Sequence, residues 1–278
     1  MCEVIRGRIS LKRSWLVVGL IFLLLFPCSS LRAAVAPQPA ANAGFNAYLE
    51  KVEARLLHQH QSPTSFLTGL DPSRERLRRG ELVIENLNNG SDINLPGAML
   101  HHWRGTAFVP GAHVADFERL MKDFNAYPQH FSPEVLQAKL LSEHDDNGVD
   151  HISSSMRVRQ KHVLTVVMDM TYDVSFARLD GQHGYSSSRS TRVAEIESSG
   201  TNKERALSDS EGHGFLWRLN TYWSYEEADG GLYMQIESVS LTRSIPTGLA
   251  WAIKPFVESV PRESLEFTLR SACNDLKK

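Results

Sequence analysis

The chain has 278 residues, of which 42% are hydrophobic and 22% charged, and its formal net charge is −2. These values are typical of a globular protein with a sizeable core. A chain without a basic surplus lacks the positive face that nucleic-acid binding requires, so nucleic acid is excluded as a partner. Of the three cysteines, Cys2 and Cys28 lie near the N-terminus and only Cys273 lies in the main body, which predicts a core held without an internal disulfide.

The first 36 residues have the pattern of an export segment. Basic residues between Arg6 and Arg13 precede the apolar run "WLVVGLIFLLLF" at 15–26. This is typical of a secretory signal peptide, and the run is shorter than the roughly 20 residues that span a bilayer. "AVA", ending at Ala36, and "ANA", ending at Ala43, are alternative cleavage sites. We therefore predict that 1–36 is a signal peptide or an uncleaved signal anchor. The protein is then exported, periplasmic or extracellular, and an uncleaved segment would tether it at a membrane surface.

Residues 37–98 are predicted to form a linker and an N-terminal helical extension. The Ala/Pro/Asn-rich stretch 37–44 is interpreted as the linker. In "FNAYLEKVEARLLH", an apolar stripe at helical spacing predicts a helix with one buried face, formed by Phe45, Leu49, Val52 and Leu56. "LDPSRERLRRG" then predicts a short helix, "ELVIENL" a short strand and "NNGSDINLPG" a loop.

From residue 99 to 278 the pattern predicts one domain. A strand at 100–109 is followed by a helix over "AHVADFERLMKDF" and by a loop or short helix at "NAYPQHFSP". Six long strands follow, at 135–142, 148–160, 163–177, 184–196, 215–227 and 232–242. Their Asp-Gly and Asn-Gly turns predict antiparallel hairpins. The chain becomes helical after Pro246, and Pro261 suits the first turn of a final helix. This helix is expected to cover the apolar face of the sheet.

This order of elements resembles the helix-grip fold of the START-like (SRPBCC) superfamily, which includes lipid-transport proteins and polyketide cyclases and dehydrases. The stretch "VPGAHVADFERLMKDFNAYPQHFSPEV" carries the resemblance, with Asp123, Tyr127 and Pro128 in an Asp-x-x-x-Tyr-Pro pattern common in the group. "SLTRSIP" leads from the last strand into the closing helix, as in these proteins. The resemblance implies an α+β fold in which a curved antiparallel sheet wraps on a long C-terminal helix. It also implies a cavity between sheet and helix for an apolar or amphipathic ligand.

The candidate ligand-binding side chains are large, aromatic or flexible residues expected on the inward side of the strands. They are Met156, Met168, Met170, Tyr172, Trp217, Trp223 and Met234. Methionine fills irregular gaps, so such a wall suits a variable hydrophobic ligand; alternatively, the same side chains pack directly on the final helix. Arg189 is a candidate for fixing a carboxylate or phosphate group, the alternative being an Arg–Glu pair on the outer sheet face.

The function favoured by these observations is an exported, non-catalytic protein that holds a lipid or other hydrophobic small molecule. A cyclase- or hydrolase-type enzyme is the alternative, and it requires an inward polar pair such as Arg189 with Tyr172 or Glu237. A third interpretation is an envelope scaffold whose 45–97 extension fills the pocket. We expect no cofactor and no metal: His101 and His102 point to opposite faces of a strand, and no phosphate loop or nucleophile motif occurs.

Overall fold

The computed structural model describes residues 36–88, 92–161, 165–245 and 250–278, with side chains from residue 259 onward in the last range. Ten antiparallel strands form a sheet with the order β1-β3-β10-β9-β7-β6-β5-β4, while β2 pairs with β3 and β8 with β7. The strands are β1 (Val83–Asn86), β2 (Ile93–Leu95), β3 (Ala98–Pro110), β4 (Val135–Asp146), β5 (Val149–Lys161), β6 (Thr165–Arg178), β7 (His183–Glu197), β8 (Arg205–Ala206), β9 (Arg218–Ala228) and β10 (Gly231–Arg243).

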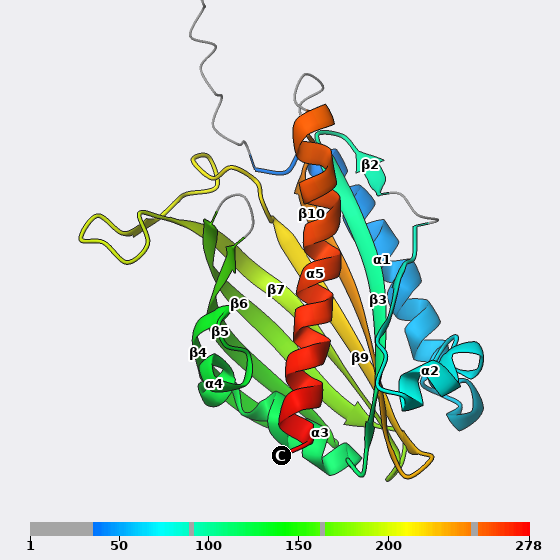
Figure 1. Cartoon of the computed structure of the whole chain (residues 1–278). Coiled ribbons are helices and arrows are strands. Elements are labelled where there is room, and N and C mark those ends of the chain that lie inside the picture. The colour runs from blue at the N-terminus through cyan, green and yellow to red at the C-terminus, as the bar shows by residue number, and fades with distance from the viewer. Residues whose placement is uncertain (1–35, 89–91, 162–164, 246–249) are drawn as a thin grey trace, which may run out of the picture. The chain divides into compact units, whose positions relative to one another are not determined.

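Two long helices lie on opposite sides of this sheet. The sheet curves around α5 (Ala250–Leu276), whereas α1 (Pro39–Gln59) lies behind it (Figure 1). We call the side toward α5 the inner face and the side toward α1 the outer face. The shorter helices are α2 (Arg74–Arg78), α3 (Val114–Lys122) and α4 (Tyr127–His130). The predicted α+β helix-grip arrangement is therefore confirmed.

Both long helices differ from the prediction at their ends. α1 begins at Pro39, within the stretch predicted to be a linker, because proline suits the first helical turn and Ala41 extends the buried stripe. α5 is continuous from Ala250 to Leu276, although it contains Pro255 and Pro261 and each proline removes one helical hydrogen bond. The predicted start of the final helix at Pro261 was wrong. The predicted export segment at 1–35 lies outside the described residues.

The outer face is buried where α1 covers it. The predicted stripe of Phe45, Leu49, Val52 and Leu56 is confirmed, since all four are buried against the sheet. The outer side of β9 is covered as well, because Tyr222 lies beneath α1 in the same cluster. The extension therefore adds a second, smaller core on the outer face. Among the described helices, none has the length and hydrophobicity to cross a membrane.

Candidate functional site

The inner face and α5 enclose the candidate site, and strand alternation decides which side chains reach it. Gly105 of β3 lies directly under α5: a Cβ atom there would come within 2.5 Å of Leu269 Cδ1 and 2.7 Å of Leu265 Cδ2. Glycine thus permits the closest approach of helix and sheet. The leucines of α5 and the inward residues of β5, β6, β9 and β10 belong to one buried cluster.

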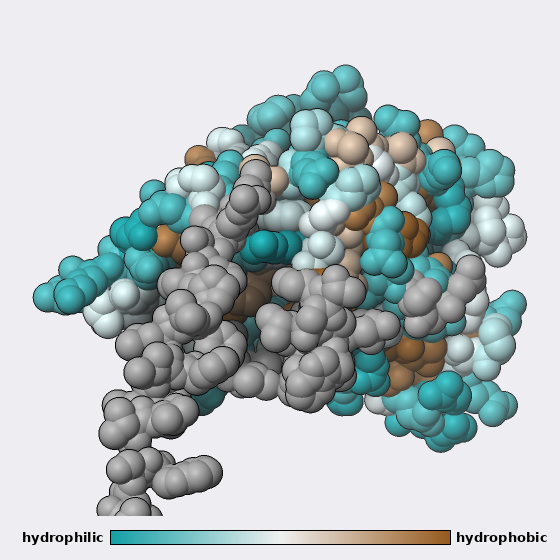
Figure 2. Space-filling view, turned by 90° about the horizontal axis from the view of Figure 1, so that it is seen from above, coloured by the Kyte–Doolittle hydropathy of each residue, from teal (hydrophilic) through white to brown (hydrophobic). Residues whose placement is uncertain are grey.

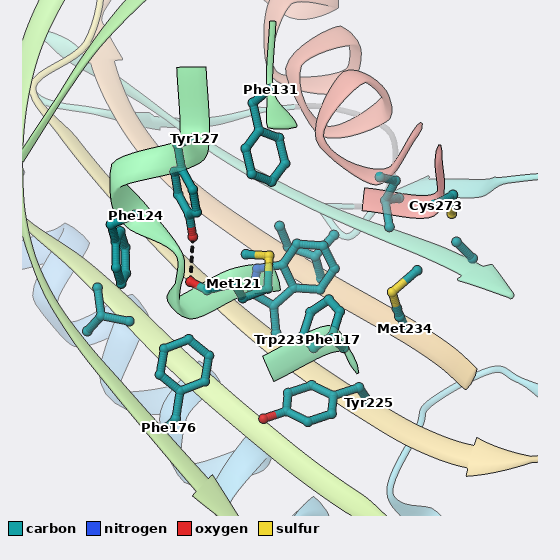
Figure 3. Close-up of a cluster of buried hydrophobic side chains, with 14 of the residues drawn as sticks. Phe117, Met121, Phe124, Tyr127, Phe131, Phe176, Trp223, Tyr225, Met234 and Cys273 are labelled. Carbon is teal, nitrogen blue, oxygen red and sulfur yellow. Dashed lines mark hydrogen bonds between the residues drawn. The ribbon is translucent and has the colours of Figure 1, made fainter. Parts of the chain in front are cut away.

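The end of this space next to α3 is filled by packed side chains, and we call it the packed end. The Phe117 ring lies 5.1 Å from that of Trp223 and 4.6 Å from that of Tyr225. Figure 3 shows these rings meeting Met234 from β10. The hydroxyl of Tyr127 donates a hydrogen bond of 2.6 Å to the carbonyl of Met121, which fixes α4 against α3. Aromatic contacts at these distances are typical of a dense core.

A buried carboxylate closes the packed end. Glu118 of α3 accepts hydrogen bonds from the Tyr225 hydroxyl at 2.9 Å and from Arg178 Nε at 2.9 Å, and Arg178 Nη2 reaches its other oxygen at 2.6 Å. Burial and the neighbouring Glu118 raise the pKa of Tyr225 above its usual value, so the hydroxyl remains a donor. Glu118 and Arg178 thus pair with each other, and neither charge is left free for a ligand at the packed end.

The opposite end of the inner face is less completely covered, and we call it the open end. Its side chains are apolar but only half-buried; they are Met156, Val158, Val166, Val193, Leu216 and Leu219. Figure 2 looks onto this end and shows hydrophobic atoms beside hydrophilic ones. Half-buried aliphatic side chains facing inward are apolar surface that the described part of the chain leaves partly uncovered.

Six of the predicted site residues lie on the inner face. Five belong to its buried cluster: Met168, Met170, Tyr172, Trp223 and Met234. Met156 is the half-buried one, and it borders the open end. The structure therefore brings these six together on one wall.

Trp217 was predicted to line the same wall but lies elsewhere. It precedes β9, its backbone N–H bonds to the Leu241 carbonyl at 2.8 Å, and its ring packs against the cluster formed with α1. There it lines a separate hollow of about 330 Å³ between the N-terminal segment 36–42 and the end of β7. The displacement arises because the pairing of β7 with β9 ends at Arg189 and Asn220, so Trp217 lies outside that ladder.

Arg189 faces outward, which corrects its predicted place in the pocket. An irregularity between Thr171 and Tyr172 leaves an extra residue on β7 at Thr191, so Arg189 and Val193 point to opposite faces. Arg189 pairs with Glu53 of α1, with Nη2 2.9 Å from Oε2. The alternative expectation of an outer Arg–Glu pair is thus the observed one.

Sequence analysis missed a buried polar network under α1. Glu237 contacts Arg55, and its Oε2 lies 3.0 Å from His102 Nε2. His102 Nδ1 lies 2.9 Å from the Tyr48 hydroxyl. Burial raises the pKa of Glu237, but the hydrogen bond with His102 and the charge of Arg55 outweigh it, so the pKa lies below its usual value. The alternating pattern of β10 places Glu237 on a face, but only the position of α1 reveals that this face is covered.

The inward polar pairs predicted for an enzyme do not form. Glu237 and Arg189 lie on the outer face, whereas Tyr172 lies on the inner face with its hydroxyl 3.1 Å from Met170 Sδ. His101 and His102 do point to opposite faces: His101 Nε2 lies 2.9 Å from Thr242 Oγ1. Within the described ranges, no three His, Cys, Asp or Glu residues gather as metal ligands would.

Comparisons with known proteins are limited to structure, because no family model and no curated protein matches the chain. A STAR-related lipid transfer protein from Xanthomonas axonopodis aligns with 17% identity and a TM-score of 0.41, over 68% of this chain and 98% of that one. A START superfamily protein from Mycobacterium smegmatis aligns with 13% identity and a TM-score of 0.41, over 63% and 97%. An aromatase/cyclase from Streptomyces sp. R1128 aligns with 13% identity and a TM-score of 0.42, over 64% and 94%. The chain thus resembles START-type proteins, a likeness of fold that carries no conclusion about ligand or activity.

Proposed function

We propose that this protein binds a hydrophobic or amphipathic small molecule between the inner face and α5. The observation that carries the proposal is the change along the inner face from a filled packed end to an apolar, half-buried open end. Binding sites for such ligands are concave and mainly apolar, and burial of the ligand supplies most of the affinity. The helix α1 of the extension packs on the outer face, away from this side of the sheet.

The full-length protein, expressed in bacteria and purified gently, tests the proposal by native mass spectrometry. We expect excess mass that disappears after organic extraction. Val158→Trp places an indole in the open end and should abolish this mass, whereas Thr171→Trp adds the same group on the outer face and should not. A clean protein mass, with no binding of a neutral dye such as Nile red to the extracted protein, would contradict the proposal.

Export is part of the same proposal and is supported by the sequence pattern of residues 1–36. An exported ligand carrier would meet its cargo at a membrane surface, and an uncleaved segment would keep it there. The mass of the purified chain also shows whether the export segment has been cleaved. A species that begins at Pro37 or at Gly44, recovered from the periplasm of the host, would support export. Full-length protein found only in the cytoplasm would contradict it.

A further inference from the structure

A line of hydroxyl-bearing residues crosses the inner face between the packed end and the open end. Its members are Ser154, Tyr172, Ser190, Ser188, Thr221 and Ser238, which we call the hydroxyl belt. The strand register places them side by side: Ser154 pairs with Tyr172, and Tyr172 with Ser190. Two residues along β7, Ser188 pairs with Thr221, and Thr221 with Ser238. The belt thus continues from β5 to β10, and on β7 it shifts by two residues from Ser190 to Ser188.

The inward orientation of the belt follows from its neighbours. Val174 is opposite Ser188 and belongs to the inner cluster, as do Trp223 and Ile236, which lie two residues from Thr221 and Ser238. Trp103 of β3 pairs with Ser238 and extends the belt with its indole N–H. Strand alternation therefore directs these side chains toward α5.

The belt contains polar atoms that the protein leaves without partners. Ser154 is fully buried, and its Oγ has no hydrogen-bond partner in the described part of the chain; Trp103 Nε1 is likewise buried and unpaired there. A buried polar group without a partner is costly and is rare in native structures. Ser188, Thr221 and Ser238 are only half-buried, so part of their surface is left uncovered by the described residues. These atoms indicate a partner supplied from outside the chain.

Charge on the inner face restricts the nature of that partner. From the belt to the open end, the described inward strand residues include no arginine or lysine. Glu195 is fully occupied: Oε2 accepts the backbone N–H of His213 at 2.9 Å, and Oε1 that of Gly214 at 2.9 Å. Among the described inward strand residues there, a ligand carboxylate or phosphate would meet no cation other than His101, whose Nδ1 already lies 2.8 Å from Asp92 Oδ1, so burying that charge would carry a large desolvation cost.

We propose that the ligand is an uncharged molecule with a hydroxyl or carbonyl oxygen, held by the hydroxyl belt, with apolar parts on either side of it. This inference rests on the proposed function and names the chemical class of its ligand. Serine and threonine hydroxyls both donate and accept, so they match hydroxyl and carbonyl groups alike, and the indole N–H of Trp103 adds a donor. The apolar residues on both sides of the belt fit a molecule with an oxygen at an intermediate position.

Fluorescence titration of the full-length protein at pH 8 with three probes of one ring system tests the inference. The probes are anthracene, 9-anthracenemethanol and ionised 9-anthracenecarboxylate. We expect the alcohol to bind most tightly and the carboxylate most weakly. The double variant Thr221→Val/Ser238→Ala should weaken alcohol binding by about 2- to 10-fold, the range for one neutral hydrogen bond, and leave anthracene binding unchanged. The matched outer-face variant Thr171→Val/Ser155→Ala should change neither.

The possible outcomes separate the two proposals. Tightest binding of the carboxylate, or an equal loss of alcohol and anthracene affinity in the double variant, would overturn the assignment of ligand class while leaving hydrophobic binding intact. If none of the three probes binds the extracted protein, the proposed function itself fails and the belt has no ligand to recognise.

Discussion

Protonation of His60 should destabilise the protein as the pH falls from 7 to 5. His60 is 8% exposed at the end of α1, and its Nε2 lies 2.7 Å from Ser224 Oγ on the outer face. Its ring stacks on Tyr185 with 4.3 Å between centroids. Burial lowers the pKa of His60 from 6.5 to about 4. The folded protein therefore holds a neutral imidazole over most of this range.

The sign and size of the effect follow from linkage. Between pH 6.5 and 4 the unfolded chain binds a proton at His60 that the folded chain does not. The folded state is therefore at its most stable, with respect to this group, above pH 6.5, and the free energy of unfolding decreases as the pH falls. The free energy of unfolding should fall by about 2 kcal/mol at pH 5 and by about 3 kcal/mol at the limit below the folded pKa.

Urea unfolding followed by tryptophan fluorescence at pH 7 and pH 5 measures this change. His60→Gln should remove the contribution, so that its free energy of unfolding changes by about 2 kcal/mol less than that of the wild type. His58→Gln, at an exposed position of the same helix, should behave as the wild type. Equal pH dependence in the wild type and His60→Gln would refute the idea that the folded protein holds His60 neutral.

Three other predictions concern the core and a second titrating group. Gly105→Ala should lower the free energy of unfolding by about 1–3 kcal/mol, because the added Cβ meets both leucines of α5; Gly181→Ala, in open space, is the urea-denaturation control. Leu269→Ala leaves a cavity under α5 and should cost about 2–5 kcal/mol in the same assay, against less than about 0.5 kcal/mol for exposed Leu57→Ala. Burial, and then the nearby Glu263, raises the pKa of Glu134 from 4.5 to about 7, so its stabilising protonated form is lost as the pH rises through 7. Glu134→Gln should therefore be more stable than the wild type at pH 8 and equal to it at pH 4, and equal stability at both values would contradict this.

The sequence predicted the parts of the fold that depend on local pattern. The alternation along β6 correctly places Met168, Met170 and Tyr172 on one inward side, because side-chain period in a strand is a local property. The Asp-Gly and Asn-Gly turns likewise set the strand boundaries. The order of elements and the closing helix were sufficient for the helix-grip arrangement.

The errors arose where distant contacts decide the outcome. The extra residue at Thr191 reverses the facing of Arg189 relative to Val193, and nothing in the β7 sequence marks that irregularity. Trp217 leaves the inner wall because the pairing of β7 with β9 stops before it. The coverage of Glu237 depends on where α1 docks, and the helical stripe of α1 does not specify its partner surface. The hydroxyl belt likewise appears only when the register of five strands is known.

Because α1 docks on only one part of the outer face, we expect the two parts of the sheet to differ in local stability. The outer-face cluster that includes α1 involves β3, β9 and β10, whereas no described residue of β4 or β5 belongs to that cluster and β4 ends the sheet without a second neighbour. The part of the sheet formed by β3, β9 and β10 thus lies between two helices, whereas α1 does not extend over β4 and β5 (Figure 1). Amide hydrogens of β4 should exchange with solvent faster than those of β10. For the ligand proposed above, we expect the β4–β5 part of the sheet to adjust to molecules of different width more readily than the β3–β10 part.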